Sequence, residues 1–109
     1  MPWLHLVSWF CGGALLANAV PHVVSGLMGR AFQSPFARPR GAGLSSAVTN
    51  VWWGFFNLAL AYALLAQVGH FDLRDTACMA TAGAGALLLG LCMARHFGRF
   101  NGGSTQERR

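Results

Sequence analysis

Residues 41–71 read GAGLSSAVTNVWWGFFNLALAYALLAQVGHF, and this run of 31 residues contains no Asp, Glu, Lys or Arg. Residues 1–29 and 76–94 also lack these four residue types, so 79 of the 109 positions lie in three uncharged spans. A helix that crosses the hydrocarbon core of a bilayer needs about 20 largely apolar residues. The three spans therefore predict an all-α membrane protein whose three transmembrane helices form a small bundle.

The composition of the whole chain points the same way. Charged residues make up 10% of the chain, whereas a typical soluble domain has about 25%. For the chain as a whole, this excludes a soluble globular enzyme, a disulfide-stapled secreted domain and a disordered tail. Lys and Ile are absent while Ala, Gly, Leu and Arg are abundant, which is typical of a GC-rich bacterial genome. We therefore expect a multi-pass protein of the bacterial inner membrane.

The breaks between the uncharged spans set the expected boundaries. We expect a single transmembrane domain over residues 1–100, with helices at about 3–29, 45–68 and 75–96, and a disordered cytoplasmic tail over 101–109. Pro21 removes one amide donor and clashes with the carbonyl of Ala17, so the first helix is expected to kink there.

The arginines predict the orientation of the chain. Seven of the eight lie between the first and second spans or after the third: Arg30, Arg38, Arg40, Arg95, Arg99, Arg108 and Arg109. Arg74 alone lies in the second connection, beside Asp72 and Asp75. The positive-inside rule then places the N-terminus outside and the C-terminus in the cytoplasm.

Because these arginines flank membrane spans, nucleic acid is not an expected partner, and the lipid bilayer is. Five arginines are predicted to contact lipid headgroups: Arg30, Arg38, Arg40, Arg95 and Arg99. The connection 30–43 contains two prolines and two glycines. It is expected to lie along the membrane surface with Phe32 and Phe36 in the acyl boundary. The alternative is a plain loop that only obeys the positive-inside rule.

Polar residues recur at helical spacing inside the first two spans. Asn18, His22 and Ser25 share one face of the first helix, and Asn50 and Asn57 share one face of the second. Comparing depths at 1.5 Å per residue predicts two layers between antiparallel neighbours, Asn18 with Asn57 and His22 with Asn50. Such a polar cluster inside a membrane either marks function or holds helices together.

The third span carries a stripe of small residues. They recur at every fourth position: Cys78, Ala82, Ala86, Gly90 and Ala94. Stripes of this kind let another helix approach closely. The sequence leaves open whether the partner is the first helix, the second helix or another subunit.

The sequence offers little for catalysis. No acidic residue lies inside a span, and no catalytic motif is present, so no catalytic residue is predicted. His5 and His70, with Asp72, could form at most a weak exposed metal site, and His22 and His96 lie at different depths. We therefore expect no metal and no cofactor.

Several motifs of the first two spans resemble those of a known family. They are Asn18-Ala-Val-Pro-His22, Gly26, Gly29, Phe32, Ser34-Pro-Phe36, Gly41, Gly43-Leu-Ser-Ser46, Asn50 and Trp53-Gly-Phe-Phe-Asn57. This segment, residues 15–65, resembles an uncharacterised family of small bacterial integral membrane proteins. The resemblance implies that the first hairpin is the recognisable unit, and it brings no activity or cofactor.

Three functions remain open. The leading prediction is a non-catalytic accessory or assembly subunit that binds other helices through its small-residue stripe, in a homo-oligomer or a larger membrane complex. The first alternative is a homo-oligomeric channel or carrier whose solute path is lined by Asn18, His22, Asn50 and Asn57. The second alternative is a membrane redox or enzyme subunit that uses His22.

Overall fold

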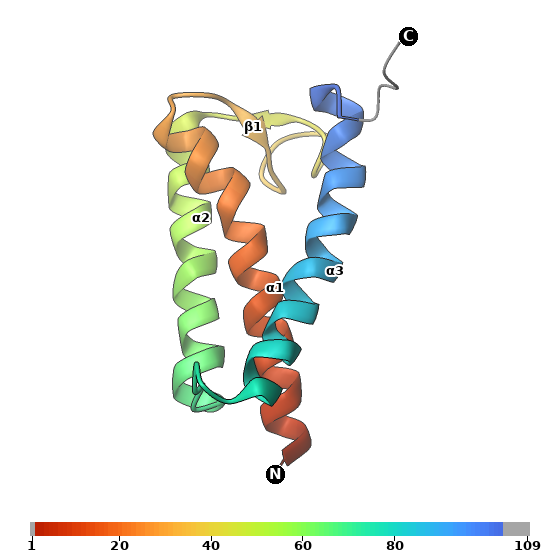
Figure 1. The fold of residues 1–109 in the computed structure, drawn as a ribbon. Coiled ribbons are helices and arrows are strands. Elements are labelled where there is room, and N and C mark those ends of the chain that lie inside the picture. Colours follow the sequence, from red (N-terminus) through yellow and green to blue (C-terminus); the bar gives the residue numbers. More distant parts are fainter. Residues whose placement is uncertain (1, 104–109) are drawn as a thin grey trace, which may run out of the picture.

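Three long helices dominate the computed structural model, which describes residues 2–103 (Figure 1). They are α1 (Pro2–Leu27), α2 (Ala47–Tyr62) and α3 (Thr76–Asn101), and α2 continues as a π-helix, η1 (Ala63–Val68). The segments Pro2–Leu27, Ala47–Val68 and Thr76–Asn101 are each long and apolar enough to cross a membrane. The chain is thus a helical protein of the membrane-spanning type.

The helix ends follow from local capping. The Ser46 side chain accepts a hydrogen bond from the Thr49 amide and starts α2, and the Asp75 side chain does the same for the Ala77 amide at the start of α3. Side chains of this type satisfy amides that lack partners in the first turn of a helix. The helix α1 continues through Pro21 as one α-helix.

The third helix is longer than the sequence predicts. It runs past the expected end near residue 96 to Asn101, and Gly102 follows in the left-handed conformation with φ 84°. Glycine adopts this conformation without steric cost and commonly ends helices. Residues 101–103 are thus the last turn and cap of α3 rather than the start of a disordered tail. Residues 104–109 of the predicted tail lie outside the described residues.

The helix α1 is the central element of the fold. It packs along both α2 and α3, whereas α2 and α3 make few contacts with each other. Figure 1 shows that the separation between α3 and α2 increases toward the C-terminal end of α3. The three helices therefore form an open arrangement around α1.

The connection between α1 and α2 is a folded unit with strands that the sequence does not predict. Two short antiparallel strands, β1 (Phe32–Gln33) and β2 (Leu44–Ser45), pair with Phe32 opposite Ser45. Between them, the Gly41 amide donates to the Ser34 carbonyl (2.9 Å), and the Ser34 and Ser45 hydroxyls are hydrogen-bonded. The hairpin lies across the ends of α2 and α3 (Figure 1). Short strands bounded by polar turns give no periodic signal in the sequence.

The interior of the fold is polar and its exterior is apolar. The largest fully buried side chains are His22, Asn50, Asn57, Cys78 and Ser34. Large apolar side chains such as Trp52 and Leu27 are 75% and 70% exposed. This reversal of a soluble core is expected where lipid surrounds the helices, because polar side chains must then find partners within the protein.

Candidate functional site

The centre of the candidate site is a buried pair that joins α1 to α2. His22 on α1 is 2% exposed, and Asn50 in the first turn of α2 is fully buried. The Nδ1 atom of His22 lies 2.6 Å from the Oδ1 atom of Asn50. This is one of the two pairs that helical depth predicts.

Asn50 also holds the hairpin. Its amide nitrogen donates to the carbonyl oxygens of Phe32 (3.3 Å), Ser45 (3.1 Å) and Ser46 (3.0 Å). These three acceptors fix the orientation of the side-chain amide, because only the NH₂ group can donate to them. Its Oδ1 must therefore be the acceptor toward His22, so Nδ1 of His22 carries the hydrogen.

This tautomer leaves a lone pair on Nε2 of a neutral His22. Three aromatic rings surround the imidazole edge to face, with ring centroids 5.5 Å away for Phe32, 6.2 Å for Phe97 and 6.4 Å for Trp53. The ring of Phe32, which the sequence predicts in the acyl boundary, packs against both His22 and Phe97. The site thus joins α1, α2, α3 and the hairpin around one imidazole.

The chemistry that this site offers is narrow. Nε2 can accept one hydrogen bond or one proton. Within residues 2–103, no group of three or more His, Cys, Asp or Glu side chains could hold a metal ion. The two histidines of the predicted weak outer site, His5 and His70, do lie near each other, with ring centroids 6.1 Å apart.

The second predicted pair lies nearer the middle of the helices. The Asn18 amide nitrogen donates to Oδ1 of Asn57 at 3.0 Å, and the Asn57 amide nitrogen donates to the Trp53 carbonyl of its own helix at 2.8 Å. Ser25 is only half-buried, and its hydroxyl joins neither pair among the described residues. The predicted cluster of five is thus two separate pairs, without Ser25.

The small-residue stripe of α3 faces α1 only in part. Cys78 is buried, and a Cβ atom added at Gly13 of α1 would overlap the Ala82 carbonyl group. Gly85 lies equally close to the Phe10 carbonyl. Because an α-helix has 3.6 residues per turn, a stripe of period four rotates by about 40° at each step. The face toward α1 therefore contains Cys78, Ala82 and Gly85, while Ala94 is exposed.

Several contacts that position the site were not predicted. The His96 Nε2 atom lies 2.6 Å from the Gly41 carbonyl oxygen, and the Asn101 amide donates to the Gln33 side chain at 2.9 Å. At the opposite end, the Ser8 hydroxyl donates to the Leu64 carbonyl of η1. Single polar residues near helix ends carry no spacing signal that could have identified these partners.

The predicted lipid-contacting arginines are all exposed: Arg30, Arg38, Arg40, Arg95 and Arg99. They belong to the hairpin end of the molecule, whereas Asp72, Arg74 and Asp75 lie in the connection at the opposite end (Figure 1). The charge asymmetry read from the sequence is therefore also an asymmetry between the two ends of the fold.

Comparisons of this chain with family models, curated proteins and solved structures find no match. The resemblance of residues 15–65 to small bacterial membrane proteins stays a prediction.

Proposed function

We propose that this chain is a non-catalytic accessory or assembly subunit of the bacterial inner membrane, which binds a helix of a partner protein through α3. One observation carries the proposal. The small-residue surface of α3 is only partly covered by α1, since a Cβ atom added at Gly83 or at Gly90 would have no atom within 4 Å.

The uncovered part of α3 borders a groove. Gly90 and Ala94 line an open groove of about 580 Å³ together with Val20 and Pro21 of α1. Small residues let helix backbones approach closely and favour association inside a membrane, where apolar side chains alone give little preference for protein over lipid. A partner helix against this groove would cover the part of the stripe that α1 leaves open.

The buried polar pairs support packing over transport. The amides of Asn18, Asn50 and Asn57 are engaged in hydrogen bonds within one chain, so they are not free to line a solute path. The channel alternative would require these bonds to open. The redox alternative rests on the single Nε2 lone pair of His22.

For orientation, we propose that the hairpin and the C-terminus face the cytoplasm and the N-terminus faces outward. Reporter fusions after Arg74 and at the C-terminus test this proposal. An external signal from the first and an internal signal from the second are expected, and the reversed pattern would contradict it.

The partner-binding proposal is tested by extracting the chain with its surrounding lipid and measuring the mass of its complexes by native mass spectrometry. We expect a stoichiometric complex with a larger membrane protein. We also expect Gly83→Leu and Gly90→Leu to abolish it, because both positions are open in the free chain. The matched control is Ala84→Leu, at an exposed position next to Gly83 but on another face of α3. A strict monomer, or equal loss in the control, would contradict the proposal.

A further inference from the structure

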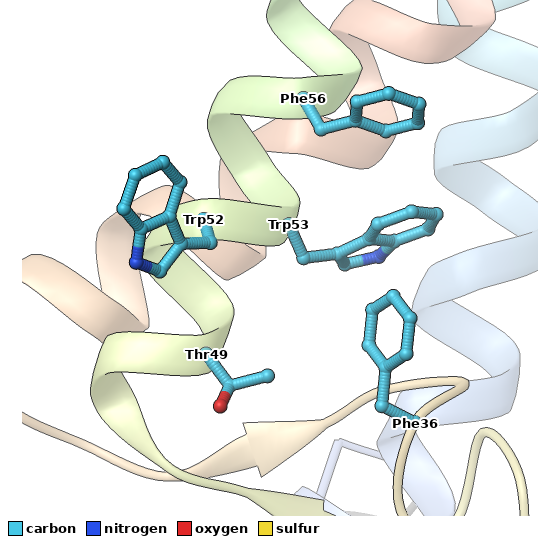
Figure 2. A pocket seen from close by; sticks show the side chains of 5 residues that line it. All are labelled: Phe36, Thr49, Trp52, Trp53 and Phe56. Carbon is cyan, nitrogen blue, oxygen red and sulfur yellow. The ribbon is translucent and has the colours of Figure 1, made fainter.

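A second groove, formed by α2 and the hairpin, has an aromatic lining. Phe36 of the hairpin and Thr49, Trp52, Trp53 and Phe56 of α2 surround an open volume of about 600 Å³, which we call the aromatic groove. Figure 2 shows the rings of Phe36, Trp53 and Phe56 on one side of it and Trp52 on the other. The groove is independent of the α3 surface proposed for the partner helix.

The rings of the aromatic groove are held in place by the fold. The Phe36 ring meets the Trp53 ring edge to face with centroids 5.0 Å apart, and Trp53 stacks on Phe56 at 5.8 Å. The Phe36 amide donates to the hydroxyl of Ser34, which is 1% exposed. These contacts order the side of the groove that Phe36, Trp53 and Phe56 form, whereas Trp52 on the other side is 75% exposed.

The length of the groove suits a lipid chain. From Thr49 to Phe56 the helix rises about 10 Å at 1.5 Å per residue. This is about two thirds of one leaflet of a hydrocarbon core roughly 30 Å thick. An acyl chain lying along α2 would contact aromatic faces over this distance.

Two arginines follow the groove residue Phe36 closely in the sequence. Arg38 and Arg40 follow Phe36 at the second and fourth positions along the hairpin, and both are exposed. The aspartates of the described chain, Asp72 and Asp75, lie at the opposite end of the fold. Two exposed cations within four residues of a groove-lining phenylalanine would complement a phosphate attached to an acyl chain.

We propose that the aromatic groove and the adjacent arginines form a binding site for one anionic phospholipid. Its acyl chain lies against Trp53 and Phe56, and its phosphate lies near Arg38 and Arg40. Each arginine near an anionic surface strengthens the binding of an anionic lipid. For two arginines, the expected preference for an anionic over a zwitterionic lipid is about 30-fold.

The test uses quenching of tryptophan fluorescence by brominated acyl chains in nanodiscs. The full chain keeps Trp53 as its single tryptophan through Trp3→Phe, Trp9→Phe and Trp52→Phe, and a second chain keeps only Trp3 at the opposite end. Bromine is placed either on phosphatidylglycerol, at about 10% of the lipid, or on the same amount of phosphatidylcholine.

In the first chain, we expect brominated phosphatidylglycerol to quench Trp53 far more than brominated phosphatidylcholine does. In the second chain, we expect the two brominated lipids to quench Trp3 to the same extent. Equal quenching of Trp53 by the two lipids would overturn the proposal, because the groove would then take any acyl chain. The lack of quenching by either lipid would also overturn it, because another protein segment would then cover the groove.

A pair of double variants separates a built site from general surface charge. Arg38→Gln with Arg40→Gln is expected to remove the preference for phosphatidylglycerol. Arg95→Gln with Arg99→Gln removes the same charge from the same end of the molecule and is expected to preserve it. Equal loss in both double variants would overturn the proposal. All four side chains are exposed, and unchanged helicity by circular dichroism verifies folding.

Discussion

Replacing Asn50 by Ala should uncouple the hairpin from the helices, and Asn57→Ala is a matched control for this change. Both asparagines are buried on the same face of α2, at 0% and 2% exposure, so both variants remove the same atoms. The difference lies in the bonds that leave their own helix. Asn50 is bonded to His22 of α1 and, in the hairpin, to Phe32 and Ser45, whereas Asn57 is bonded only to Asn18.

The expected magnitude follows from these bonds. A hydrogen bond between helices in a membrane contributes about 0.6 kcal/mol on average, and a buried donor left without a partner costs about 1–3 kcal/mol. Three lost bonds plus the stranded Nδ1 hydrogen of His22 give a loss of about 3 kcal/mol in the free energy of unfolding for Asn50→Ala. In the control, the single bond of Asn57 and the amide donor of the half-buried Asn18 that it leaves without a partner give about 2 kcal/mol.

The assay combines two measurements on the chain in mild detergent. Titration with a denaturing detergent, followed by circular dichroism, reports the free energy of unfolding. Cleavage by trypsin after Arg40 reports opening of the hairpin. We expect it to be about tenfold faster in Asn50→Ala, because local opening frees the backbone at the exposed Arg40, where the Gly41 amide is otherwise bonded to Ser34. Equal destabilisation in the two variants, with unchanged cleavage, would refute the conclusion that Asn50 anchors the hairpin.

Three further predictions concern single contacts. Gly13→Ala should lower the melting temperature, with a cost of roughly 1–3 kcal/mol, because its Cβ atom would overlap the α3 backbone; Gly83→Ala has open space and should raise stability by up to about 1 kcal/mol. Ser8→Ala should speed hydrogen exchange in η1, since it removes a bond worth about 1 kcal/mol; unchanged exchange there would argue against this role. His96→Leu should speed tryptic cleavage of the hairpin several-fold with little effect on global melting, because it removes one hydrogen bond between α3 and the hairpin while the bond from Asn101 to Gln33 remains.

The sequence predicted the helices and the polar pairs because each depends on a regular period. The lengths of the three uncharged spans predict the three helices. The helical spacing of the polar residues, combined with their depth along each helix, is enough to match Asn18 to Asn57 and His22 to Asn50. The hairpin depends instead on single contacts between residues far apart in the chain, such as Asn101 with Gln33. No period encodes such pairs, so the sequence suggested a loop and a tail where the structure has strands and a helix end.

The Asn50 side chain makes contacts of both kinds: one that helical spacing predicts and others that no period encodes. Its spacing from Asn57 placed it on the face toward α1, which predicted His22 as its partner. Its position in the first turn of α2 also brings its NH₂ group to the carbonyls of the hairpin. A single amide can serve both sides because it donates and accepts at once, whereas a leucine at this position would satisfy neither. The polar residue that the sequence marks as a candidate for function is therefore bonded to the connection, and we expect the folding of the connection, with the groove beside Phe36, to depend on it.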